Sequence, residues 1–287
     1  NTLGFVIPLY GINSNRLNQA SFFEFIAGMS KKINSENIQF IMTFANTIDE
    51  EKNAYEKLIK INKVNKIILH NLKKNDSRIN YLKKNKINFV GWGRTQGKIN
   101  FPWVDLDNEG SVKLIMEYLY SKNHKNIAFI NVEEKYNFAY QRKQGYIKFL
   151  KKNNLIFKKN LYISISNEDP DQAAIVIEKK ILNNSKITAI ICSTEYSAAG
   201  AIKACNKLNK KVGIDISLIT FDGTVVNSIS SPSLTAITHD RKKLGSEAIE
   251  ILTSLKKSKS KTYFLAKPEI IERGSVLTLK NNKTVIK

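Results

Sequence analysis

The sequence predicts an α/β protein with two doubly wound lobes, each built on a parallel sheet. Strand-like and helix-like segments alternate along its 287 residues. The strand-like runs are almost continuously apolar, which is typical of parallel strands covered on both faces. Four βα units precede about residue 103 and four follow it, so two lobes are the simplest arrangement. A single eight-stranded βα barrel is the rival architecture, but it does not explain the irregular stretch from Gly93 to Val104.

The expected strands are short apolar runs bounded by polar residues. They comprise residues 3–7, 38–44, 66–69, 87–91, 126–131, 161–165, 187–192 and 216–221, with a further extended run at 234–238. Helical periodicity fills the gaps between them. Capping signals mark several helix starts, namely the Thr47–Glu50 capping box, Asp107, Asp169-Pro170 and Asp240.

The residues that follow the expected strands indicate the kind of ligand. Open α/β sheets place ligand contacts at the carboxyl ends of their strands, and in two such lobes these ends face one cleft. Asp222 is a lone carboxylate directly after one strand, and Tyr10 and Trp92 follow two others. A polar and aromatic lining with few charges suits a neutral, polyhydroxylated molecule. Aromatic faces cover the C–H face of a sugar, while polar side chains bond its hydroxyls.

The composition argues against several other functions. The net charge of +21 is scattered in pairs of basic residues, which fits compositional bias better than a nucleic-acid surface. No nucleotide-binding, zinc-protease or C-x-x-C motif occurs, and no nucleophile–base pair stands out, so we expect no enzyme activity, cofactor or metal. No apolar run has the roughly 18 to 20 residues of a membrane span. Cys192 and Cys205 fit buried, reduced thiols in the cytoplasm.

An ordered series of short motifs resembles the effector-binding core of the LacI/GalR family of bacterial transcription regulators. The series comprises residues 3–8, 22–29, 89–95 (FVGWGRT), 104–110 (VDLDNEG), 123–128 (NHKNIA), 142–146 (RKQGY), 195–200 (EYSAAG), 214–217, 221–222 (FD), 232–235, 244–245 and 273–275. Two positions depart from the family pattern. Asn123 stands where glycine is usual, and Glu195 stands where aspartate is usual.

The resemblance implies a periplasmic-binding-protein-like fold of two lobes joined by three crossovers. The expected lobes are residues 1–103 plus about 238–258, and residues 104–237 plus about 259–287. The family carries a helix-turn-helix and a hinge helix in front of this core. Because Asn1 stands only two residues before an apolar strand, we expect that this DNA-binding domain has been left off.

The resemblance also implies ligand-binding residues. Arg142 is the strongest candidate, because a guanidinium fork can grip two adjacent hydroxyls or a carboxylate. Asp222 matches the family's ligand-binding aspartate. The other expected contacts are Tyr10, Phe22, Trp92, Tyr136, Phe138, Glu168 and Thr194. For Phe22, packing in the hydrophobic core is the alternative, and Glu168 falls where relatives place an aromatic contact.

The expected function is a cytoplasmic, sugar-responsive repressor that works as a homodimer and binds operator DNA through the missing domain. The dimer contacts are expected on the outer helices of the first lobe, around residues 25–33 and 49–61, and on matching second-lobe surface. A periplasmic sugar-binding protein of a transport system is the alternative, since it shares the fold. The motif series favours the regulator.

Overall fold

The computed structural model describes residues 1–11, 20–166, 169–182, 186–255 and 261–280. The chain divides into two compact units, which are described separately below. The first unit contains residues 1–107, 133–141 and 239–267, and the second contains residues 108–132, 142–238 and 268–287.

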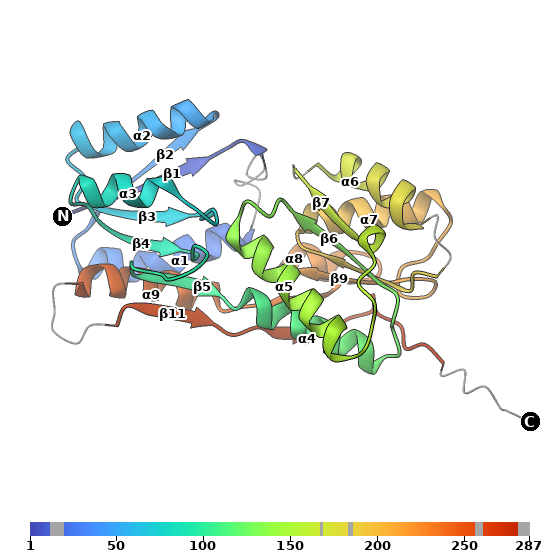
Figure 1. The fold of residues 1–287 in the computed structure, drawn as a ribbon. Helices are drawn as coiled ribbons and strands as arrows, with labels where there is room; N and C mark the ends of the chain where they lie inside the picture. The colour runs from blue at the N-terminus through green and yellow to red at the C-terminus, as the bar shows by residue number, and fades with distance from the viewer. Residues whose placement is uncertain (12–19, 167–168, 183–185, 256–260, 281–287) are drawn as a thin grey trace, which may run out of the picture. The chain divides into compact units, whose positions relative to one another are not determined.

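The first unit is built on a six-stranded sheet whose strands are all parallel. Its strand order is β11 (Tyr263–Ala266), β5 (Trp103–Leu106), β4 (Asn88–Trp92), β3 (Lys66–His70), β1 (Thr2–Pro8) and β2 (Gln39–Ala45). Helices α1 (Ala20–Ser35) and α9 (Arg241–Ser254) cover one face of the sheet, and α2 (Ile48–Lys60) and α3 (Ser77–Lys84) cover the other (Figure 1).

The second unit repeats this plan with one antiparallel edge. Its strand order is β12 (Glu269–Ile271), β10 (Thr235–Thr238), β9 (Ser217–Phe221), β8 (Ala189–Cys192), β6 (Ile127–Val132) and β7 (Tyr162–Ile165). Only β12 runs antiparallel to its neighbour. Its α-helices are α4 (Asn108–Ser121), α5 (Asn137–Lys152), α6 (Pro170–Ile177), α7 (Glu195–Lys207) and α8 (Val225–Ile229), and a π-helix (Glu178–Leu182) continues α6.

Two parallel-dominated sheets with alternating helices confirm the predicted fold class and reject the single barrel. The structure places the boundaries between units differently from the sequence at several points, which include residues 104–107 in the first unit. Residues 261–267 were expected in the second lobe but lie in the first unit, because β11 pairs with β5 at the edge of the first sheet. The segment 133–141, which includes the first residues of α5, also groups with the first unit, through backbone bonds such as Asn137 N to Leu72 O.

Local signals in the sequence account for several helix starts. The Asp169 side chain accepts from the backbone of Asp171 and Gln172, and Asp240 accepts from Lys243 N, as predicted. At α2 the Thr47 side chain accepts from Glu50 N.

The expected return bond of that capping box takes a different partner. The Glu50 carboxylate accepts from the backbone of Asn46, not from that of Thr47. The box therefore forms with a shift of one residue.

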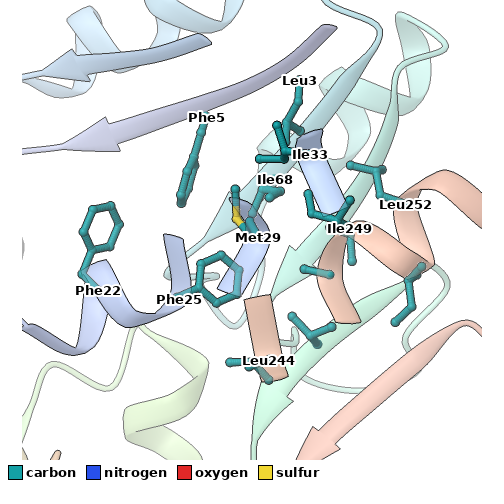
Figure 2. Close-up of a cluster of buried hydrophobic side chains, with 14 of the residues drawn as sticks. Leu3, Phe5, Phe22, Phe25, Met29, Ile33, Ile68, Leu244, Ile249 and Leu252 are labelled. Atoms are coloured by element: carbon teal, nitrogen blue, oxygen red, sulfur yellow. The ribbon is translucent and has the colours of Figure 1, made fainter. Parts of the chain in front are cut away.

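Helices α1 and α9 approach each other closely enough to require glycine at two points. A Cβ atom added to Gly28 would lie 1.9 Å from the carbonyl oxygen of Lys242, and one added to Gly245 would lie 2.1 Å from that of Phe25. Around this contact, apolar side chains of both helices pack with the sheet into one cluster (Figure 2). The close contact gives a physical reason for two glycines of the family-like motifs.

The turn at Asn123 shows why asparagine serves there in place of glycine. The backbone of Asn123 has a φ of 70°, in the left-handed region that asparagine tolerates better than most residues. The next residue, His124, is fully buried, and its ring bonds Thr188 Oγ1 at 2.9 Å and Leu277 O at 2.9 Å. Burial is the largest cause that lowers the pKa of His124. Through these two hydrogen bonds the ring joins Thr188, the residue before β8, to Leu277 in the C-terminal segment.

Candidate functional site

Arg142 lies in the second unit with its guanidinium fixed on three sides. Its Nε donates to Asn108 Oδ1 at 3.0 Å, and its Nη1 donates to the backbone oxygen of Ser193 at 2.9 Å. The guanidinium carbon stands 3.6 Å from the centroid of the Phe221 ring, a close cation–π contact. Only 6% of the residue is exposed.

These contacts explain how the fold positions the guanidinium. Arg142 belongs to the second turn of α5, Asn108 begins α4, and Ser193 directly follows β8. Phe221 is the last residue of β9. The three residues that hold the guanidinium therefore lie at strand or helix ends, and open α/β sheets place ligand contacts at the edge where such ends meet. A buried charge held in this way is pre-organised to bind oxygen atoms.

Asp222 follows Phe221 and adopts an unusual backbone conformation. Its φ of 63° lies in the left-handed region. This conformation is unfavourable in free energy for a residue that has a Cβ atom. Its carbonyl oxygen accepts from Thr224 N at 2.8 Å and from the side-chain nitrogen of Asn227. Glu195 in turn accepts from Thr224 Oγ1 and, at 3.3 Å, from Asn227 Nδ2. This network holds the turn that carries the candidate carboxylate.

Thr194 has a structural role that the sequence did not reveal. It is the N-cap of α7, and its Oγ1 accepts from Ser197 N at 3.1 Å while Ser197 Oγ accepts from Thr194 N at 3.1 Å. The two residues therefore form a capping box with serine in the third position, which the usual S/T-x-x-E/Q pattern does not detect. The ligand contact expected of Thr194 stays a prediction.

The other candidates in the described chain lie in the first unit. The Tyr10 hydroxyl donates to Glu51 Oε2 at 2.5 Å. Burial and this hydrogen bond raise the pKa of Tyr10. Tyr136 and Phe138 lie close together, with ring centroids 6.0 Å apart, where the chain enters α5, the helix that also carries Arg142. Glu168 lies outside the described residues.

Phe22 and Trp92 belong to an aromatic stack inside the first unit. Trp92 lies nearly parallel to Phe25, with ring centroids 3.7 Å apart, and Phe22 stacks on Trp92 at 6.2 Å. Phe22 is 1% exposed and lies in the hydrophobic core. The structure therefore supports the core alternative for Phe22, and one face of the Trp92 ring is already covered by Phe25.

Two neighbours of Arg142 were not assigned a role from the sequence. In the sequence, Asn108 is visible only as part of a motif and Ser193 only as a residue after a strand. A hydrogen bond between distant segments leaves no local signal.

Within the described residues there is no cluster of His, Cys, Asp and Glu that could hold a metal ion. Nor does any helix in that part of the chain have the length and apolarity to cross a membrane.

Comparison with known proteins identifies the class of this chain. The family described as periplasmic binding protein-like domain matches residues 116–276, so the chain belongs to that family. The expected resemblance to LacI-family regulators is confirmed by its relatives and by the fold of solved regulators.

Two curated relatives are regulators. The chain is 29% identical over 223 residues to the HTH-type transcriptional regulator AglR of Rhizobium meliloti, covering 77% of this chain and 61% of that protein. It is 32% identical over 165 residues to the HTH-type transcriptional repressor PurR of Histophilus somni, covering 57% of this chain and 49% of that protein. The chain thus spans about half to three fifths of their lengths.

Solved structures show the same fold. A transcriptional regulator LacI of Bacillus cereus subsp. cytotoxis superposes with a TM-score of 0.89 at 24% identity, covering 98% of this chain and 99% of that one. The transcriptional regulator CelR in complex with cellobiose superposes with a TM-score of 0.86 at 17% identity, covering 96% and 84%.

Proposed function

We propose that this chain is the effector-binding and dimerisation core of a LacI-type transcriptional regulator and that its effector is a carbohydrate. The observation that carries the proposal is the guanidinium of Arg142, which is buried on the ring of Phe221, the residue that directly precedes Asp222 in the chain. A fixed guanidinium fork offers donors to adjacent hydroxyls, and in this proposal the Asp222 carboxylate supplies the acceptor. Relatives that are regulators, and the cellobiose complex of CelR, support this assignment.

Regulation requires that the effector prefer one arrangement of the protein over another. A difference in binding free energy of about 1–3 kcal/mol gives roughly 5- to 150-fold control of DNA affinity. In this proposal DNA contact belongs to a helix-turn-helix domain of the complete protein. The core itself carries no catalytic step.

The binding site is tested by isothermal titration of the chain with cellobiose and a panel of other mono- and disaccharides. The sugar that binds is then titrated against Arg142→Lys, which keeps the charge but loses the fork. Loss of a charge-assisted hydrogen bond should weaken binding about 10- to 150-fold. Arg241→Lys, at a buried arginine that begins α9, is the matched control. Equal affinity in wild type and Arg142→Lys would remove Arg142 from the site.

The homodimer is assigned partly to the exposed apolar side of α8. Val225, Val226 and Ile229 are 72%, 58% and 77% exposed, and three adjacent apolar side chains in solvent mark an association surface. A second copy of the chain is the proposed occupant. The outer helices of the first unit stay in the proposed interface, and on α1 the side that carries Phe25 and Met29 packs against α9.

Sedimentation velocity tests this assignment. Val226→Glu should shift the chain from dimer to monomer, because a buried charge opposes association. The control is Ile156→Glu, which changes an isolated side chain that is 79% exposed. A wild-type chain that stays monomeric at high concentration would favour the alternative, a sugar-binding protein of a transport system. The two free, buried cysteines fit a cytoplasmic regulator.

A further inference from the structure

The first unit contains a pocket that none of the expected effector contacts lines. It lies between the first two turns of α2 and the start of α3, with Lys73 at its side, and has a volume of about 300 Å³. Figure 1 shows these two helices as neighbours on the same face of the first sheet. The volume is at the lower end of the range for small-molecule sites, roughly 300–1,000 Å³.

An arginine between two carboxylates forms part of the pocket wall. Arg78 Nη1 lies 2.8 Å from Glu51 Oε1, and Arg78 Nη2 lies 2.7 Å from Asp76 Oδ2. Burial opposes the ionisation of Asp76, but hydrogen bonds and charge from Arg78 outweigh burial and lower its pKa. Glu51 also accepts from Tyr10, and Asp76 caps α3. The two acidic groups are therefore already committed to partners within the protein.

Two tyrosine hydroxyls in the same pocket lack such partners. The hydroxyl oxygens of Tyr55 and Tyr81 are buried, and neither makes a hydrogen bond of ordinary geometry in the part of the chain that the structure describes, although Arg78 lies near enough to the Tyr55 hydroxyl to affect its pKa. Tyr55 is only 3% exposed. Burial raises the pKa of Tyr55, Arg78 lowers it and Glu51 raises it, with a net rise. Its hydroxyl therefore stays protonated and is a donor. A buried polar group without a partner is costly and calls for an explanation.

The remaining charge of the pocket is positive. Lys52 and Lys73 are among the residues that line it, and their ammonium groups make no ion pair within the described ranges. The pocket thus combines two hydroxyl donors, two unneutralised cations and the apolar faces of tyrosine rings and Ile48. This combination matches a molecule with an anionic end and an apolar or flat body.

We propose that this pocket is a second ligand site that binds a small organic anion. The Tyr55 and Tyr81 hydroxyls donate to its oxygens, Lys52 and Lys73 neutralise its charge, and its body packs on the tyrosine rings. Carboxylates and phosphate monoesters share this chemistry, so the experiment includes one of each.

The test is a titration of the chain with benzoate and with phenyl phosphate, followed by ligand-observed NMR and calorimetry. Phenol, which has the ring without the anion, and inorganic phosphate, which has the anion without the ring, are titrated in parallel. At least one of the two aromatic anions should saturate a single site and bind at least about tenfold more tightly than phenol or inorganic phosphate, the equivalent of one charge-assisted contact.

Substitutions then locate the site. Tyr55→Phe and Tyr81→Phe remove only the unpartnered hydroxyls, and each should weaken binding at least about fivefold without lowering the melting temperature. Lys73→Gln should weaken binding and reduce its dependence on salt. Tyr118→Phe is the matched control, because it removes another buried hydroxyl in the second unit.

The proposal is overturned if neither aromatic anion binds saturably at millimolar concentration. It is also overturned if phenol binds as well as the anions, or if both Tyr→Phe variants retain wild-type affinity. The result is independent of the effector site. Arg142→Lys should leave anion binding unchanged, and Tyr55→Phe should leave sugar binding unchanged, so failure of one assignment does not decide the other.

Discussion

The contact between α1 and α9 allows a quantitative prediction for Gly28→Ala. The new Cβ would lie 1.9 Å from the carbonyl oxygen of Lys242, whereas real Cβ contacts are at least 3.0 Å. Because that oxygen is backbone, it cannot move aside as a side chain does. The helices would have to separate by about 1 Å, and a gap of this size forfeits a quarter to a half of each dispersion contact.

The expected cost follows from opposing terms. Overpacking a core costs typically about 1–3 kcal/mol, occasionally more, and a backbone clash this short belongs at or above the upper end. Alanine returns about 1 kcal/mol of helix propensity relative to glycine. We expect Gly28→Ala to lower the free energy of unfolding of the first unit by about 2–3 kcal/mol net, because the packing cost exceeds the propensity gain.

Tryptophan fluorescence during urea unfolding measures this effect, because both tryptophans of the chain, Trp92 and Trp103, lie in the first unit. Ser30→Ala, at an exposed position of the same helix, is the control and should change stability by less than about 0.5 kcal/mol. Gly245→Ala should act on the same contact and combine non-additively with Gly28→Ala. A Gly28→Ala protein as stable as the Ser30→Ala control would refute the proposed close contact.

Two further predictions concern the second unit. Because burial lowers the pKa of His124, the unfolded chain takes up a proton more readily, and stability should fall as the pH drops below about 6.5. Urea unfolding followed by circular dichroism at pH 7.5 and 5.5 should show a smaller loss in His124→Gln, and an equal loss would contradict this linkage. Ser275 Oγ accepts from Thr235 N at 2.8 Å and donates to Leu218 O at 2.5 Å. Ser275→Ala should therefore cost about 1–3 kcal/mol in the same assay at pH 7.5, whereas the exposed Ser228→Ala should not.

The strands that the sequence predicted share a run of apolar residues, and in most of them this run is buried. The edge strand β2 is an exception, because Ala45 is its one buried residue. β6 and β9, for example, are buried at every position, so both faces show in the sequence. β5 was missed because it has four residues and includes Asp105, whose charge is neutralised by Arg94 at 2.8 Å. β11 and β12 were missed because they are short and partly exposed edge strands. Their pairing is set by tertiary contacts.

Helix ends show a similar limit. In the sequence Ile61 stands at helical spacing from Ala54 and Leu58 and so continues the apolar face of α2, but it is the C-cap residue and is 69% exposed. Periodicity continues past a helix end without marking it, so the sequence extended the buried face by one residue too many. Capping residues with strong side-chain acceptors, such as Asp169 and Asp240, were predicted correctly because their signal is local.

The candidate site was predictable as residue types but not as an arrangement. Arg142 and Asp222 came from motifs, whereas the ring of Phe221 beneath the guanidinium, and the Asn108 and Ser193 bonds that aim it, join four separate segments. No single segment records such a junction. The sequence therefore indicated which groups could bind a ligand. The fold shows in addition that protein contacts hold the Arg142 guanidinium in place without a ligand.

The departure at Glu195 can be explained by the turn at Asp222. A left-handed residue with a Cβ atom costs roughly 1–2 kcal/mol, so the φ of Asp222 must be held by other contacts. Thr224 and Asn227 hold its carbonyl oxygen, and both also donate to the Glu195 carboxylate. Because Glu195 stands in the first turn of α7, its longer side chain gives it the reach to bond both. The glutamate thus belongs to the machinery that orients the candidate ligand-binding aspartate.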